Sequence, residues 1–106
     1  MPKVTYIQAD GGRESVEIAV GASVMDGALD FGIGGILGQC GGGCTCLTCH
    51  CYVDPQWASR MPAPSADELE LLEYAYERRP TSRLSCQIFL TEQLQGLCIE
   101  IPIRQT

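Results

Sequence analysis

The first residues of the chain alternate between apolar and polar side chains, as expected for a strand with one buried face. Over residues 3–8, Val4 and Tyr6 share one face of such a strand. Asp10-Gly11-Gly12 is a typical hairpin turn, and the alternation resumes over residues 14–20. The pattern therefore predicts an N-terminal β-hairpin.

The next segment has the apolar spacing of a helix and is preceded by a residue suited to capping its N-terminus. Ser23-Val24-Met25-Asp26 fits a capping box, so a helix is predicted to begin there. Val24, Ala28 and Phe31 would share its buried face, and Gly32 would end it.

A second capping pattern, Ser65-Ala66-Asp67-Glu68, predicts another helix that runs to about Glu77. This helix holds five of the thirteen acidic residues of the chain, namely Asp67, Glu68, Glu70, Glu73 and Glu77. At about 100° per residue, all of these except Glu68 fall in one arc of about 120°. Leu69, Leu72 and Tyr76 fall on the neighbouring, inward face. An ordinary solvated helix face would give the same pattern, so the stripe alone assigns no function.

The remaining elements are short. Strands are predicted over residues 50–54, 87–90 and 98–101, one helical turn over 55–58 and a turn over 93–96. The glycine-rich residues 32–43 are predicted to form a loop.

Composition narrows the class of protein. A chain of 106 residues is expected to form one domain. Its net charge of −6 disfavours binding to nucleic-acid phosphates, and no apolar run is long enough to span a membrane. The N-terminus enters a strand pattern at once, which argues against a signal peptide. Seven cysteines are an odd number and are tightly clustered, which favours a reducing cytoplasm over a secreted disulfide scaffold.

The candidate chemistry lies in the cysteines. Cys40, Cys46 and Cys49 have the spacing C-x5-C-x2-C, and Cys86 follows much later. Three clustered ligands and a distant fourth are the usual layout of a four-cysteine iron–sulfur site. The plant-type and bacterial ferredoxin spacings are both absent, and a zinc ribbon needs two C-x-x-C knuckles where this chain has one. A zinc-stabilised interaction module and a thiol redox protein using Cys46 and Cys49 remain the alternatives.

Other residues around this motif have supporting roles. Backbone N–H groups at Gly41, Gly42 and Gly43 are placed to approach cluster sulfurs closely. The surplus cysteines are expected to be small buried hydrophobes, although one of them lies inside the loop and could compete as a ligand. They are Cys44, Cys51 and Cys98. His50 is expected to brace the loop, since a Rieske site would need two histidines.

Two segments, Cys40–Val53 and Ser82–Ile88, resemble the adrenodoxin/putidaredoxin type of 2Fe–2S ferredoxin, and the resemblance extends nearly from end to end. It implies an α+β, β-grasp fold with a mixed sheet, helices packed on one side and a cluster-binding loop. It also implies that residues 1–106 form a single ferredoxin domain with one 2Fe–2S cluster.

The resemblance also implies a role and partners. The chain would be a soluble, monomeric, cytoplasmic one-electron carrier, not an enzyme, between an FAD-dependent NAD(P)H ferredoxin reductase and a cytochrome P-450 monooxygenase. Iron–sulfur cluster assembly or a ring-hydroxylating oxygenase would be rival destinations for the electron. The matching helix in the family docks basic partner surfaces, and the positions that match here are Asp67, Glu68, Glu70 and Glu73. His50 would bridge towards that helix.

Overall fold

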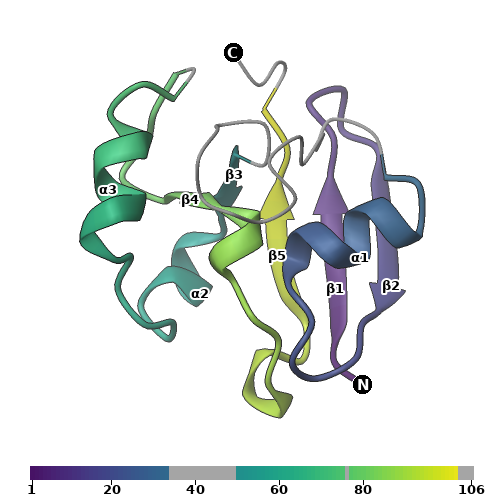
Figure 1. Ribbon diagram of the computed structural model, residues 1–106. Coiled ribbons are helices and arrows are strands. Elements are labelled where there is room, and N and C mark those ends of the chain that lie inside the picture. Colours follow the sequence, from purple (N-terminus) through teal and green to yellow (C-terminus); the bar gives the residue numbers. More distant parts are fainter. Residues whose placement is uncertain (34–49, 76, 103–106) are drawn as a thin grey trace.

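The structure is a computed structural model that describes residues 1–33, 50–75 and 77–102. Its described strands form one mixed sheet in the order β2-β1-β5-β3-β4 (Figure 1). The strands are β1 (Lys3–Ile7), β2 (Arg13–Glu17), β3 (His50–Val53), β4 (Ser82–Leu84) and β5 (Leu97–Glu100). Strands β1 and β5 pair in parallel, while the other neighbours are antiparallel. This arrangement confirms the predicted α+β class.

The N-terminal hairpin forms as predicted. Its turn is closed by the Gln8 N–H, which donates to the Gly12 carbonyl at 2.7 Å, and Gly11 takes the left-handed conformation with φ 93°. Strand β2 ends earlier than predicted, and Val20 is 53% exposed. The chain turns away at Gly21, whose N–H donates to the Leu90 carbonyl.

Helix α1 (Val24–Asp30) begins with the predicted capping box between Ser23 and Asp26. It lies across the sheet face over β1 and β2 (Figure 1), where the Tyr6 hydroxyl donates to the Val24 carbonyl at 2.7 Å. A Cβ atom at Gly27 would overlap the Ile18 side chain, so this close approach requires glycine. The prediction that Phe31 is buried is wrong, because it follows the helix and is 55% exposed.

The second half is built from short elements around β3 and β4. They are α2 (Pro55–Ala58), α3 (Ala66–Leu72) and the 3-10 turns η1 (Ser85–Gln87) and η2 (Glu92–Leu94). Helix α3 packs beside the edge strand β4 and ends at Leu72, earlier than predicted. Glu77 has φ 45° and therefore lies outside the helix. No helix in the described ranges is long and apolar enough to cross a bilayer.

The segment after β4 differs from the prediction. Residues 87–90 were expected to form a strand, but η1 takes up the first of them and Phe89 makes only an isolated bridge to Ser23. Strand β4 itself was not predicted, because three residues are too few for a periodic pattern. Together, β4 and η1 place Cys86 just beyond the sheet and against α1.

Candidate metal centre

Cys86 is the described member of the predicted ligand set. It lies in η1, directly after β4, and is 3% exposed. The other predicted ligands, Cys40, Cys46 and Cys49, lie outside the described residues, as do Cys44 and residues 41–43. Within the described part of the chain, no group of three or more histidine, cysteine or acidic side chains could hold a metal ion.

The fold brings both flanks of residues 34–49 towards the Cys86 turn. On the C-terminal side, His50 pairs with Leu84, two residues before Cys86, in the β3–β4 ladder. On the N-terminal side, Ile33 is buried in the core after α1, and α1 packs against η1. One end of this segment therefore lies beside the strand that leads to Cys86, and the other end follows a helix that packs against the Cys86 turn.

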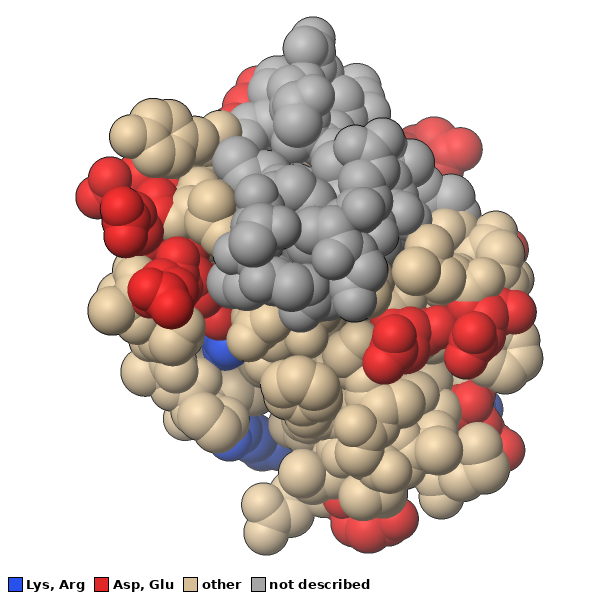
Figure 2. All heavy atoms as spheres, in the orientation of Figure 1, with Lys and Arg blue, Asp and Glu red and all other residues tan. Residues whose placement is uncertain are grey.

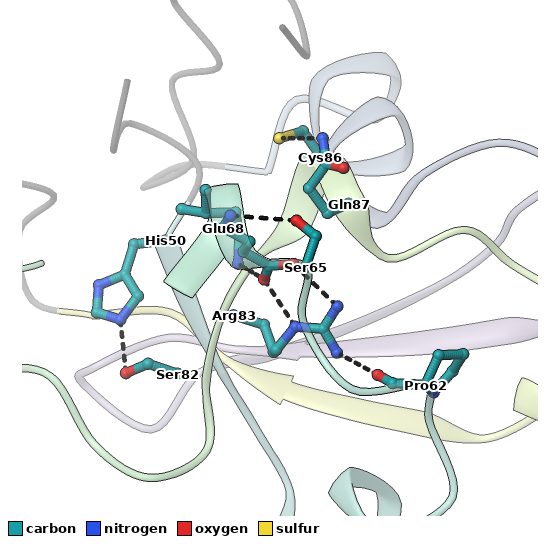
Figure 3. A network of polar contacts seen from close by, with 9 residues as sticks. His50, Pro62, Ser65, Glu68, Ser82, Arg83, Cys86 and Gln87 are labelled. Carbon is teal, nitrogen blue, oxygen red and sulfur yellow. Dashed lines mark hydrogen bonds and ion pairs between the residues drawn. The ribbon is translucent and has the colours of Figure 1, made fainter. Parts of the chain in front are cut away.

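The surroundings of Cys86 suit an anionic sulfur group. The side-chain amide of Gln87 donates to Cys86 Sγ with Nε2 and Sγ 3.4 Å apart (Figure 3). The hydroxyl of the preceding residue, Ser85, is fully buried and has no hydrogen-bond partner in the structure as described. An unsatisfied buried hydroxyl costs about 1–3 kcal/mol, and cluster sulfurs are acceptors that could satisfy one. A buried thiol, an amide donor and a spare hydroxyl thus fit a 2Fe–2S cluster.

The sequence drew attention to Cys86 but not to its two polar neighbours. Ser and Gln are common surface residues, and only their adjacency to a candidate ligand could have marked them. Their positions depend on η1, whose last residue, Gln87, was predicted to begin a strand.

The surplus cysteines differ from one another. Cys51 is fully buried, and this burial raises the pKa of its thiol to about 12, against the opposing effect of the Arg83 charge. It is therefore a neutral, buried side chain, as predicted. Cys98 is only partly buried, and its thiol donates to the Gly96 carbonyl at 3.6 Å.

His50 braces β3 against β4, whereas the loop that it was predicted to brace lies outside the described residues. Its Nε2 lies 2.9 Å from the Ser82 hydroxyl oxygen, which also accepts the Arg79 N–H at 2.8 Å. The imidazole meets the Tyr52 ring edge-on, with 4.9 Å between centroids. Burial, followed by the charge of Arg79, lowers the pKa of His50 to about 4, so the ring is neutral near pH 7.

Glu68 corrects the predicted docking set. Its carboxylate is 1% exposed and accepts two hydrogen bonds from the Arg83 guanidinium, at 2.7 and 3.1 Å (Figure 3). It also accepts the Leu84 N–H at 2.9 Å, while Arg83 donates to the Pro62 carbonyl at 3.1 Å. Glu68 therefore ties α3 to β4, and the expectation that it contributes to a docking surface is wrong.

The rest of the acidic stripe is on the surface. Asp67, Glu70 and Glu73 are all exposed, and acidic side chains gather over α3 on the left of Figure 2. Leu72 is buried as predicted, whereas Leu69 is 43% exposed, because the inward position beside it is occupied by Glu68.

Comparison with known proteins identifies the family. The model of the 2Fe-2S iron-sulfur cluster binding domain matches residues 7–91. Rhodocoxin from Rhodococcus erythropolis is 42% identical over 106 residues, which cover 99% of each chain. The crystal structure of a ferredoxin from Rhodopseudomonas palustris HaA2 is 46% identical, with a TM-score of 0.96 over 99% of this chain and 100% of that one.

A third similarity is to putidaredoxin, a protein of Pseudomonas putida, as seen in a covalent complex with putidaredoxin reductase. The identity there is 42% and the TM-score 0.91, covering 96% of this chain and 99% of the neighbour. Fold, sequence and the surroundings of Cys86 agree, so the chain belongs to the 2Fe–2S ferredoxins of the adrenodoxin/putidaredoxin type and its cofactor is one 2Fe–2S cluster.

Proposed function

We propose that this ferredoxin carries single electrons from an FAD-dependent NAD(P)H ferredoxin reductase to a cytochrome P-450 monooxygenase. The observation that carries the proposal is the near full-length similarity to putidaredoxin, a protein found in a covalent complex with its reductase. The whole chain, residues 1–106, would act as one domain, and as a monomer. It would transform no substrate of its own and would act in the cytoplasm, where thiols such as Cys51 and Cys98 stay reduced.

The proposed cluster ligands are Cys40, Cys46, Cys49 and Cys86. When bound, the cluster supplies reversible one-electron chemistry. The described residues hold one sulfur donor in a buried position, because β4 and η1 fix the backbone on both sides of Cys86. The Gln87 amide orients the sulfur, and the core around α1 excludes water from it.

Single serine substitutions test the ligand set. Each of Cys40→Ser, Cys46→Ser, Cys49→Ser and Cys86→Ser should lose or badly weaken the cluster, because thiolates suit iron far better than hydroxyls do. Cys51→Ser and Cys98→Ser are the matched controls and should keep the wild-type iron content. Iron and sulfide analysis with visible absorbance is the measurement. A Cys86→Ser protein with normal iron beside a Cys98→Ser protein without it would overturn the assignment.

The proposed docking surface is the exposed acidic face of α3, formed by Asp67, Glu70 and Glu73. A negative face would steer a basic partner into contact, yet each exposed charge pair contributes only about 0–1 kcal/mol, so the complex can separate quickly. A shuttle needs both properties, since it must bind two partners in turn.

Turnover with defined partners tests the function. Purified protein should be reduced by an FAD-containing ferredoxin reductase and should then support substrate oxidation by a P-450 reconstituted with both. Replacing the P-450 by a ring-hydroxylating oxygenase, or by a cluster-assembly reaction, tests the rival destinations in the same mixture. Reduction without transfer to any P-450, combined with efficient transfer to a rival, would contradict the proposed acceptor but retain the carrier role.

A further inference from the structure

The geometry points to the side chain of Gln87 as a residue that sets the reduction potential of this ferredoxin, by donating a hydrogen bond to the Cys86 sulfur. The inference rests on the proposed ligand role of Cys86. Gln87 Nε2 and Cys86 Sγ lie 3.4 Å apart, within hydrogen-bonding reach of a sulfur acceptor (Figure 3). The amide has two N–H groups, so it can donate to sulfur and still present a second donor elsewhere.

The physical effect follows from where charge accumulates. Reduction adds one negative charge, part of which resides on the ligand sulfurs. A hydrogen bond to a sulfur therefore stabilises the reduced state more than the oxidised state and raises the potential. The effect is large only where water cannot replace the lost donor. Cys86 is 3% exposed, so solvent has little access to its sulfur.

The fold holds the amide in place. Cys86 and Gln87 are consecutive residues of η1, so the single turn brings the Gln87 side chain back along the Cys86 side chain. Gln87 is half-buried and lines a surface hollow together with Ile88, Phe89 and Leu94. Among the described residues, the contact made by the Gln87 amide nitrogen is the one to Cys86 Sγ.

Two substitutions remove the donor while preserving side-chain length. Gln87→Met is unbranched and apolar, and Gln87→Glu exchanges the amide for a carboxylate that cannot donate when ionised. Gln93→Leu is the matched control, because Gln93 lines the same hollow but is not adjacent to Cys86. Reduction potentials are measured by optical titration on cluster-loaded protein, and iron–sulfur stretching frequencies by resonance Raman spectroscopy.

The Gln87→Met protein should show a several-fold lower ratio of reduced to oxidised protein at a fixed potential, and Gln87→Glu a larger decrease, because the added carboxylate repels the reduced state. The stretching frequency should shift in both, whereas Gln93→Leu should match wild type in both measurements. A purely structural role would change thermal stability without this ordered change in potential.

The outcomes separate this inference from the proposed ligand set. If Cys86→Ser loses the cluster but both Gln87 variants keep the wild-type potential, the tuning role is wrong and the ligand assignment stands. If Cys86→Ser keeps a normal cluster, the ligand assignment itself fails. If neither Gln87 variant can load a cluster, the tuning role is also contradicted, because Gln87 would then be needed for assembly.

Discussion

Helix α3 carries acidic residues both on its exposed face and on the face that packs against the sheet. Asp67 and Glu70 lie on the surface, whereas Glu68 between them is 1% exposed and bound to Arg83 and to the Leu84 N–H. The outer carboxylates keep their hydration and are available to a partner. The inner one has exchanged water for fixed donors and holds the helix against β4. Adjacent acids in one short helix therefore differ in role: Glu68 holds the fold together, whereas Asp67 and Glu70 belong to the proposed docking surface.

The difference in stability between the two faces should be largest when Glu68 is made neutral. Glu68→Gln should lower the free energy of unfolding by about 3–5 kcal/mol, because it leaves the Arg83 side chain, only 12% exposed, without its anion. Urea denaturation followed by circular dichroism is the measurement. Glu70→Gln is the matched control on the outer face and should change stability by less than about 0.5 kcal/mol. Equal losses in the two variants would remove the distinction between the faces.

Removing both partners tests whether the inner face depends on the pair. The double variant Arg83→Met with Glu68→Gln should lose less stability than the two single variants added together, with a coupling of about 0.5–3 kcal/mol. The reason is that the double variant leaves no buried charge unpaired. Strict additivity in a double-mutant cycle would show that Glu68 acts through the Leu84 N–H alone.

The helix cap should have a smaller effect. The Ser65 hydroxyl accepts the Glu68 N–H at 3.1 Å, and it forms half of the predicted capping box, since the Glu68 side chain turns inward to Arg83. Ser65→Ala should therefore cost about 1 kcal/mol, and Ser65→Asp, which keeps an acceptor, should cost much less. Thermal melts of the two variants compare these values directly.

Neutralising acids on the outer face should affect the rate of encounter with a partner and leave stability unchanged. Asp67→Asn with Glu73→Gln should raise the apparent KM of the reductase for the carrier several-fold at low salt, because attraction to a basic partner is weakened. The rise should shrink as the Debye length falls from ~10 Å at 0.1 M to ~3 Å at 1 M salt.

The control variant removes the same number of negative charges from a different surface. Glu14 and Glu17 are exposed on β2, at the opposite edge of the sheet from α3 and β4. Glu14→Gln with Glu17→Gln should leave KM unchanged. If both double variants behave alike in steady-state reduction, only net charge matters and α3 has no special place in docking.

The sequence predicted local features better than distant pairings. The hairpin turn at Asp10-Gly11-Gly12, the Ser23 cap and the cysteine spacing are all short patterns whose physics is contained in a few residues. Glu68 was misplaced because its partner, Arg83, lies far along the chain and a helical wheel contains no information about it.

The same reason explains the missed turn after β4. The segment Gln87–Leu90 is rich in residues that suit a strand, but its backbone follows contacts with α1 that no local pattern encodes. The roles of Ser85 and Gln87 depend on that turn, so they too were beyond the reach of sequence patterns. Cys86 itself could be proposed as a ligand from the sequence, because a distant fourth cysteine after three clustered ones is a known spacing that requires no knowledge of the turn.

The parallel pairing of β1 with β5 has a consequence for how the protein is made. In the sheet, β5 lies between β1 and β3 and joins the hairpin β1–β2 to the antiparallel pair β3–β4. Among the described strands it is also the one synthesised last, at residues Leu97–Glu100. Until then, the edges of β1 and β3 with which β5 pairs stay open, and closure of the sheet must bring together residues more than ninety positions apart, such as Val4 and Leu97. We therefore expect the two halves of the sheet to join only after β5 has been synthesised.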